Sequence, residues 1–377
     1  MIKKINLKWI LSLLIPVCFI ACQRNVIITI NEVPESTAFS DTLYFASSLN
    51  DWKPNAANYH FTQKENGAYS LELSDIKVPF EYKVTRGSWE TVESTLQGDD
   101  TENRKGQPKE KHVNIQIKGW ADSYVKTSTQ LPNVKVAAED LTMTQLNTTR
   151  RIRIYLPSDY ESSTERYPVL YMHDGQNLFD VLTSYSGEWE VDETMQQLEK
   201  SGKLKLIIVG IDNSEDRNSE YTPYVNDQYG GGKGAKYADF VVNELKPFID
   251  KSYRTKSDRV NTGIMGSSLG GVISMYIGTE YSNTFGKLGI FSPSFWWSEK
   301  CYEQVENKGF VANTKIYMNA GQEEHKWITG GTKKMEKILE KAGYLDENLI
   351  TKYVEGGTHS EAFWKIEFPK AVIWLFE

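Results

Sequence analysis

The pentapeptide Gly266-Ser267-Ser268-Leu269-Gly270 has the pattern G-x-S-x-G, which few backbone geometries accommodate. Residues 259–265 before it are typical of a buried strand, and the apolar residues 272–277 after it are typical of a helix packed on a sheet. A serine between a strand and a helix, with a glycine two positions away on each side, is typical of a nucleophile elbow. The alternative is a chance match in a Gly- and Ser-rich turn. The flanking elements favour the elbow, so we predict that Ser268 is a catalytic nucleophile.

A serine nucleophile needs a histidine that takes its proton and an acid that orients the histidine. His359 lies in a Gly-flanked loop after the strand-like residues 349–354, where such a base is expected, and we predict that it is the catalytic base. A surface loop histidine is the alternative. The remaining histidines belong to an upstream segment or to other strand-end loops: His60, His112, His173 and His325.

The N-terminus has the features of a secretory signal. Residues 1–21 contain three lysines followed by a short apolar run, which predicts an exported protein. The phrase Phe19-Ile20-Ala21-Cys22 resembles the lipobox of bacterial lipoproteins. This resemblance implies that Cys22 carries a lipid that anchors the protein to the bacterial membrane, in the periplasm or at the cell surface. An uncleaved membrane anchor is the alternative.

Composition narrows the class of protein further. The chain has 377 residues, of which 40% are hydrophobic and 25% charged, as expected for a globular protein of two domains. Its net charge of −7 argues against a nucleic-acid partner. Cys18 and Cys22 belong to the signal region, so Cys301 is left alone, and we expect no internal disulfide and no metal-binding cysteine cluster. No metal or cofactor is expected.

Residues 25–118 are typical of an all-β domain. Short alternating segments separated by Asn, Gly, Asp and Pro turns predict an immunoglobulin-like β-sandwich. The expected strands cover residues 26–30, 42–46, 68–73, 80–85 and 112–117. Residues 119–133, which are mainly polar and small, are predicted to form a linker.

Two phrases within this segment, residues 48–54 and 81–93, resemble the starch-binding modules of carbohydrate-binding family 20 and their glycogen-binding relatives of family 48. The resemblance implies a glycan site at four residues: Trp52, Lys83, Trp89 and Asn103. Aromatic rings stack on the apolar faces of sugars, so exposed tryptophans suit this role. The alternative is that both tryptophans are packing residues of a spacer.

Residues 134–377 alternate between strand-like and helix-like segments, and most of the strands are almost entirely apolar. This pattern predicts an α/β domain with a mainly parallel sheet covered on both faces. The expected helices include residues 191–200, 237–249 and 331–342.

Several phrases of this domain occur in the order found in the esterase D family of α/β-hydrolases: residues 153–157, 173–177, 220–223, 266–271 and the His359 loop. Relatives of that family include carbohydrate esterase family 1 and the enterobactin esterases. The resemblance implies an α/β-hydrolase fold and a serine esterase without cofactor. It also implies an oxyanion hole formed by the backbone N–H groups of Gln176 and Leu269.

The acid of the triad is expected between Ser268 and His359. Glu323 and Glu324 follow the strand-like residues 315–318 and the turn at Gly321. The resemblance places the acid three residues beyond this glycine, which implies Glu324. Asp212 is an alternative, although its position before the elbow breaks the usual order of serine, acid and histidine.

Two further stretches carry weaker signals. Residues 230–234 are glycine-rich but lack the ending of a phosphate loop, so a mobile loop beside the active site is the better interpretation. Residues 295–297, Phe-Trp-Trp, either line an aromatic substrate pocket or pack the fold.

Taken together, these features predict an exported serine esterase with a Ser268–His359–Glu324 triad. The expected substrate is an acylated carbohydrate that carries feruloyl or acetyl groups, and the upstream module is a possible second contact for glycan. The alternatives are a siderophore esterase of the enterobactin type and a non-catalytic glycan-binding lipoprotein.

Overall fold

The computed structural model describes residues 25–96, 98–124, 127–185, 187–344 and 347–377. The predicted signal and Cys22 lie outside these residues. The chain divides into two compact units, Met1–Tyr124 and Val125–Glu377. None of the helices in the described ranges is both long enough and apolar enough to cross a membrane.

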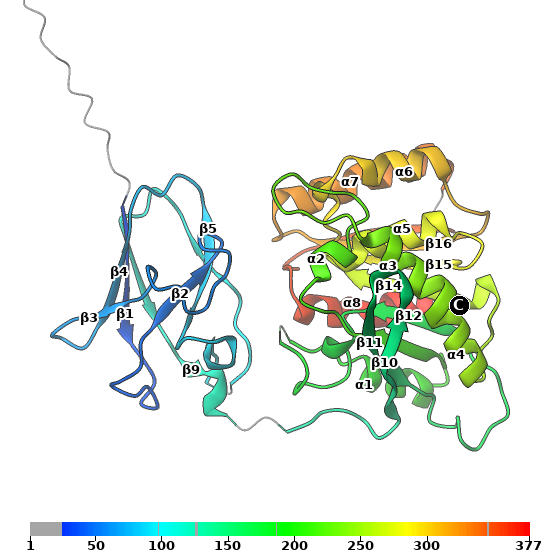
Figure 1. Ribbon diagram of the computed structural model, residues 1–377, viewed down its shortest axis with the longest axis horizontal. Helices are drawn as coiled ribbons and strands as arrows, with labels where there is room; N and C mark the ends of the chain where they lie inside the picture. Colours follow the sequence, from blue (N-terminus) through cyan, green and yellow to red (C-terminus); the bar gives the residue numbers. More distant parts are fainter. Residues whose placement is uncertain (1–24, 97, 125–126, 186, 345–346) are drawn as a thin grey trace, which may run out of the picture. The chain divides into compact units, whose positions relative to one another are not determined.

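The first unit consists of strands and short turns, drawn in blue to cyan in Figure 1. Its strands are β1 (Val26–Glu32), β2 (Tyr44–Ser47), β3 (Thr62–Gln63), β4 (Tyr69–Leu73), β5 (Phe80–Thr85), β6 (Glu93–Ser94), β7 (Arg104–Gly106), β8 (His112–Gln116) and β9 (Gly119–Trp120). They form sheets with the orders β3-β4-β1-β8, β2-β5-β7 and β6-β9. A single apolar cluster contains residues of the two larger sheets, such as Ile28 and Phe45. The immunoglobulin-like arrangement of these strands stays a prediction.

The first unit continues beyond residue 118, where the sequence analysis places the start of a linker. Gly119 and Trp120 pair with β6 as strand β9. The Trp120 side chain is fully buried in the apolar cluster, and its Nε1 donates a hydrogen bond to Thr37 Oγ1 at 2.7 Å. Burial of an indole ring this large ties the segment to the core of the unit.

The second unit is built on one eight-stranded sheet with the order β10-β11-β13-β12-β14-β15-β16-β17. Its strands are β10 (Val134–Met143), β11 (Thr148–Tyr155), β12 (Val169–His173), β13 (Ile207–Ile211), β14 (Thr262–Ser267), β15 (Lys287–Phe291), β16 (Lys315–Gly321) and β17 (Leu349–Val354). Strands β12 to β17 are parallel to their neighbours within this group, whereas β10 and β11 pair antiparallel. The predicted α/β unit with a mainly parallel sheet is therefore confirmed.

Helices cover both faces of this sheet, as Figure 1 shows. They are α1 (Val191–Lys200), α2 (Arg217–Glu220), α3 (Gly234–Phe240), α4 (Lys246–Ser252), α5 (Leu269–Glu280), α6 (Lys300–Lys308), α7 (Lys326–Lys341) and α8 (Glu361–Phe376). Side chains of a strand alternate between the faces. In β12, Leu170 and Met172 pack in the cluster of α1 and α8, while Val169 and Tyr171 pack in the cluster of α3 to α7.

Some elements differ in extent from the prediction. Residues 259–261 form a 3₁₀ turn, and the strand begins only at Thr262. The helix that follows begins at Leu269, immediately after Ser268, because the backbone turns sharply at that serine. The helix expected at 237–249 is split by a π-helical turn, Val241–Leu245, between α3 and α4.

Candidate active site

Ser268 occupies a strained turn between β14 and α5. Its φ of 58° and ψ of −120° lie in a region that a residue with a Cβ rarely adopts, at a cost of about 1–3 kcal/mol. The turn is held by the Ser268 N–H, which donates to the Phe291 carbonyl at 2.9 Å. A Cβ at Gly266 would lie 2.8 Å from the Gly270 backbone and 2.9 Å from a ring carbon of His173. The glycine at 266 is therefore required for the close approach of strand and helix.

Strand order brings three predicted residues to one edge of the sheet. Ser268, Glu324 and His359 follow β14, β16 and β17, whose C-terminal ends meet there because the strands are parallel. His359 Nδ1 lies 3.7 Å from Glu324 Oε1, which leaves Nε2 for a second partner. Among the described residues no hydrogen bond joins His359 to Ser268. Such bonds are often long in enzymes without substrate and shorten in the complex.

The Glu324 carboxylate is buried and held by neighbouring side chains. Its Oε1 accepts a hydrogen bond from Ser292 Oγ, and Ser292 Oγ accepts one from Trp364 Nε1 at 2.8 Å. Its Oε2 is buried and has no hydrogen-bond partner within the described part of the chain. Glu323, by contrast, is exposed. Of the two adjacent glutamates, Glu324 is therefore the one that faces His359.

The loop after β15 contacts both the predicted nucleophile, Ser268, and the predicted acid, Glu324. Ser294 Oγ lies 3.2 Å from Ser268 Oγ, and the Ser294 N–H donates to the Ser268 carbonyl at 3.1 Å. Ser292, two residues earlier, contacts Glu324. Sequence reasoning missed both serines. The available signal was a pair of hydroxyls just before the aromatic residues 295–297.

The two backbone donors predicted for the oxyanion hole lie on neighbouring strand ends. Gln176 is in a 3₁₀ turn, Gly175–Asn177, after β12, and Leu269 is the first residue of α5 after β14. Strands β12 and β14 are hydrogen-bonded neighbours. First-turn N–H groups have no partner within their own helix, so both are available to an oxyanion. Their role stays a prediction.

His173 ends β12, and Asp174 precedes the turn that contains Gln176. His173 is buried, and burial lowers its pKa to about 3, so the ring is neutral and pairs with the Tyr237 hydroxyl at 3.0 Å. Burial opposes ionisation of Asp174, but two hydrogen bonds from Arg217, at 2.7 and 2.8 Å, outweigh it and lower the pKa of that carboxyl. The sequence analysis did not single out Arg217, whose partner lies 43 residues away in the chain.

Asp212, the alternative acid, forms an ion pair with Arg153. Both of its carboxylate oxygens accept hydrogen bonds from Arg153, at 2.9 and 3.1 Å. A carboxylate held in this bidentate way by a guanidinium is not free to orient His359.

Exposed aromatic side chains gather beside the loop that contacts Ser268. The Trp296 ring lies 5.8 Å from that of Tyr229 and 6.1 Å from that of Trp327, and all three rings are exposed. Trp297 is buried and packs against Gly231 of the glycine-rich loop. Of the residues predicted to line a pocket, Trp296 is therefore the one that reaches solvent, whereas Phe295 and Trp297 pack the fold.

In the first unit, the four residues of the predicted glycan site differ in their surroundings. The rings of Trp52 and Trp89 lie 6.4 Å apart, and Trp89 is exposed. Lys83 is buried and forms an ion pair with Asp100. Asn103 donates to Glu81 at 3.3 Å and lines a hollow of about 840 Å³ that neither tryptophan lines. The tryptophan pair is thus the part that resembles a stacking platform.

Comparison with known proteins agrees with this architecture. Residues 143–375 match the Esterase family, described as "Putative esterase". The uncharacterized protein YbbA of Bacillus subtilis is 28% identical over 241 residues, which cover 60% of this chain and 92% of that protein. An endo-1,4-beta-xylanase/feruloyl esterase of Xylanibacter ruminicola is 28% identical over 232 residues, which cover 59% of this chain and 29% of that protein.

A solved structure shares the fold over most of the chain. The enterobactin esterase FES from Shigella flexneri, in the presence of enterobactin, has a TM-score of 0.57 at 14% identity, covering 93% of this chain and 92% of that one. The family match covers more than half of the present sequence. The chain therefore belongs to the Esterase family and is a carboxylic ester hydrolase.

Proposed function

We propose that the protein is an exported serine esterase that removes acyl groups, feruloyl or acetyl, from a polysaccharide or oligosaccharide. The observation that carries the proposal is Ser268 at positive φ, on the same sheet edge as the His359–Glu324 pair. A strained serine placed beside a histidine and a buried acid is suited to acyl transfer.

In the proposed reaction, Ser268 Oγ attacks the ester carbonyl carbon while His359 Nε2 takes its proton. The oxyanion accepts hydrogen bonds from the Gln176 and Leu269 N–H groups, each worth about a hundred- to a thousandfold in rate. The alcohol leaves with the proton from His359, and an acyl group remains on Ser268. Water then attacks the acyl carbonyl carbon and gives a proton to His359. The bond to Ser268 Oγ breaks, His359 returns the proton to that oxygen, and the carboxylic acid leaves.

The substrate class is inferred from three features. Exposed Trp296, Tyr229 and Trp327 offer flat apolar faces beside the nucleophile, which suit an aromatic acyl group or a sugar ring. A relative with the name endo-1,4-beta-xylanase/feruloyl esterase is consistent with such a substrate. The third feature is the predicted signal at residues 1–21: a protein exported by it would meet polysaccharides outside the cytoplasm.

A panel of esters tests the proposal. Purified mature protein is assayed with feruloyl oligosaccharides, acetylated xylan, simple aryl esters and a catecholate siderophore lactone. Preferred hydrolysis of a feruloyl or acetyl carbohydrate ester is expected. Preference for the siderophore would support the alternative of an enterobactin-type esterase, and no turnover together with no fluorophosphonate labelling would support a non-catalytic glycan-binding lipoprotein.

Trp52 and Trp89 are expected to bind glycan weakly. In the full mature chain with Ser268→Ala, the Trp52→Ala/Trp89→Ala variant should lose retardation in gels that contain starch, glycogen or xylan, because the stacking surface is gone. Phe39→Ala is the matched control, since Phe39 is an exposed aromatic residue of the same unit. Equal mobility of all these proteins with and without glycan would leave the unit as a spacer.

Cys22 is expected to be the site of lipidation. Acylation requires its thiol, so Cys22→Ser should release the protein from the membrane fraction or block its maturation. Fractionation followed by metabolic labelling with a fatty-acid probe measures this. If Cys22→Ser stays in the membrane fraction and the wild type takes up no fatty-acid label, the anchor is an uncleaved apolar segment instead of a lipid.

A further inference from the structure

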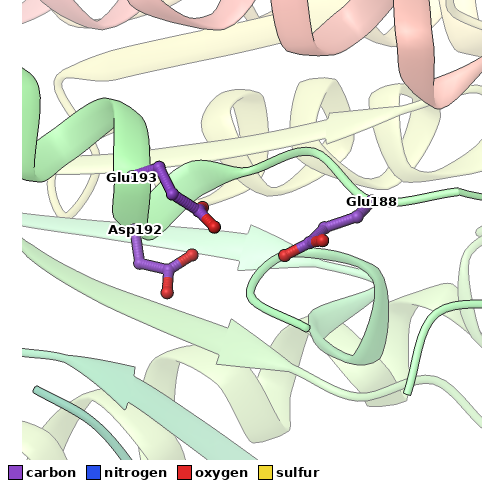
Figure 2. A group of neighbouring side chains, drawn as sticks. All are labelled: Glu188, Asp192 and Glu193. Carbon is purple, nitrogen blue, oxygen red and sulfur yellow. The ribbon is translucent and has the colours of Figure 1, made fainter. Parts of the chain in front are cut away.

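Three carboxylates outside the catalytic edge gather at the start of α1. Glu188 lies in the loop before this helix, and Asp192 and Glu193 lie in its first turn. One oxygen of each lies within 4.8 Å of those of the other two. Figure 2 shows the three side chains directed toward one another across a common space.

Two of these carboxylates are held so that one oxygen is bonded and the other is not. Glu188 Oε2 accepts a hydrogen bond from Thr129 Oγ1 at 2.8 Å, and Asp192 Oδ2 accepts one from the Leu131 N–H at 2.9 Å. The opposite oxygens, Glu188 Oε1 and Asp192 Oδ1, are buried and have no hydrogen-bond partner among the described residues. Glu193 Oε2 is in the same condition. The bonds from Thr129 and Leu131 therefore fix the orientation of the Glu188 and Asp192 carboxylates, and the unbonded oxygens face the space between the three side chains.

No basic side chain among the described residues forms an ion pair with this cluster. Asp192 is fully buried, and none of the ion pairs among the described residues includes any of the three carboxylates. The nearby Lys365 pairs with Glu190 at 2.8 Å. Asp180 and Glu190 add further negative potential at Glu188. Buried carboxylates without positive partners are costly, so a cation in the common space would stabilise the fold.

We propose that Glu188, Asp192 and Glu193 bind one Ca²⁺ ion. Ca²⁺ takes oxygen ligands at 2.3–2.6 Å, so two of its ligands can lie about 4.6–5.2 Å apart. Mg²⁺ binds at 2.0–2.1 Å, which limits that separation to about 4.2 Å. The three oxygens lie within 4.8 Å of one another, which one Ca²⁺ ion can span. Three carboxylate ligands suit the flexible shell of Ca²⁺ better than that of Mg²⁺, which is usually held by one or two carboxylates and several waters. Water would complete its shell. No metal was expected from the sequence, in which only cysteine clusters were considered as ligands.

We expect the ion to have a structural role, because residues 188–193, which it would hold, pack against residues that contact the predicted active site. Trp189, between the ligands Glu188 and Asp192, packs against Trp364 and Phe291 with ring separations of 5.6 and 5.3 Å. Trp364 in turn contacts Ser292, which holds Glu324. Loss of the ion is therefore expected to affect thermal stability more than turnover.

The test uses the full mature protein, stripped with EGTA and then titrated with Ca²⁺ or Mg²⁺. Calorimetry should give one Ca²⁺ per chain, and saturating Ca²⁺ should raise the Tm by roughly 5–10 °C, more than Mg²⁺ does. Terbium luminescence excited through tryptophan gives a second readout, since Trp189 adjoins the site. Aryl-ester hydrolysis is measured in parallel, so failure of the ion site and failure of the esterase assignment are separate results.

Glu193→Gln is the main variant, because it leaves the bonds that Thr129 and Leu131 make to the other two carboxylates in place. It should reduce the Ca²⁺ response and the terbium signal at least tenfold. Glu190→Gln is the matched control. Glu190 adds to the potential at Glu188 but is not one of the three ligands, so both responses should change by no more than about twofold. If Glu193→Gln does not fold, Glu188→Gln takes its place. Unchanged Tm with Ca²⁺ and EGTA, with no calorimetric binding at millimolar Ca²⁺, would overturn the proposal and leave carboxylates that share protons.

Discussion

Ser268→Ala is expected to lower kcat on an aryl ester by about a millionfold, the loss typical of removing a triad serine. Serine and alanine both carry a Cβ, so the substitution adds no strain to a backbone with a φ of 58°. The turn and the hydrogen bond from the residue 268 N–H to the Phe291 carbonyl should therefore persist. The Tm should therefore stay within about 2 °C of the wild type. Steady-state kinetics and thermal unfolding measure the two quantities.

Ser267→Ala is the matched control for this experiment. Ser267 precedes the nucleophile in the same pentapeptide but is buried in β14. A fluorophosphonate should label the wild type and Ser267→Ala but not Ser268→Ala. Retention of a tenth of the wild-type activity by Ser268→Ala would assign the nucleophile to another residue.

Glu324→Gln is expected to lower kcat by about ten-thousandfold, whereas Glu323→Gln should stay near the wild type. A glutamine amide cannot hold the His359 Nδ1–H as a carboxylate does, so the tautomer with a free Nε2 is no longer favoured. Glu323 is exposed and provides a control of identical chemistry one residue away.

Thermal stability separates a catalytic loss from a structural one. The Glu324 carboxylate is buried with an unbonded Oε2, so replacing a charge by a neutral amide should leave the Tm unchanged or slightly higher. A reversed pattern, with Glu323→Gln inactive, would transfer the role of the acid to Glu323.

The central sheet could be predicted where strands are long and apolar. The elbow strand, its helix and the segments around Val169 and Ile207 follow from periodicity alone. Strand β15, Lys287–Phe291, was missed because a lysine and Gly289 interrupt its apolar run. Trp120 was placed in a linker because nothing local marks an indole as part of a core that other strands build.

The candidate site divides in a similar way. Motif order selects Ser268, His359 and Glu324, and the structure places them on one edge. Ser292 and Ser294 could not be predicted, because their contacts with Glu324 and Ser268 depend on β15 lying between β14 and β16. Likewise, the carboxylates at the start of α1 are oriented toward one another by hydrogen bonds from Thr129 and Leu131, which precede them by about 60 positions in the chain. Such long-range contacts cannot be recognised in the sequence.

Trp364 contacts the predicted base directly and the predicted acid through the Ser292 hydroxyl. Its ring faces the His359 imidazole edge-on at 5.2 Å, and its Nε1 reaches Glu324 through the Ser292 hydroxyl. Because Trp364 belongs to α8, one residue of the C-terminal helix links the two side chains that are predicted to activate Ser268. We therefore expect the alignment of the predicted proton relay to depend on the position of α8.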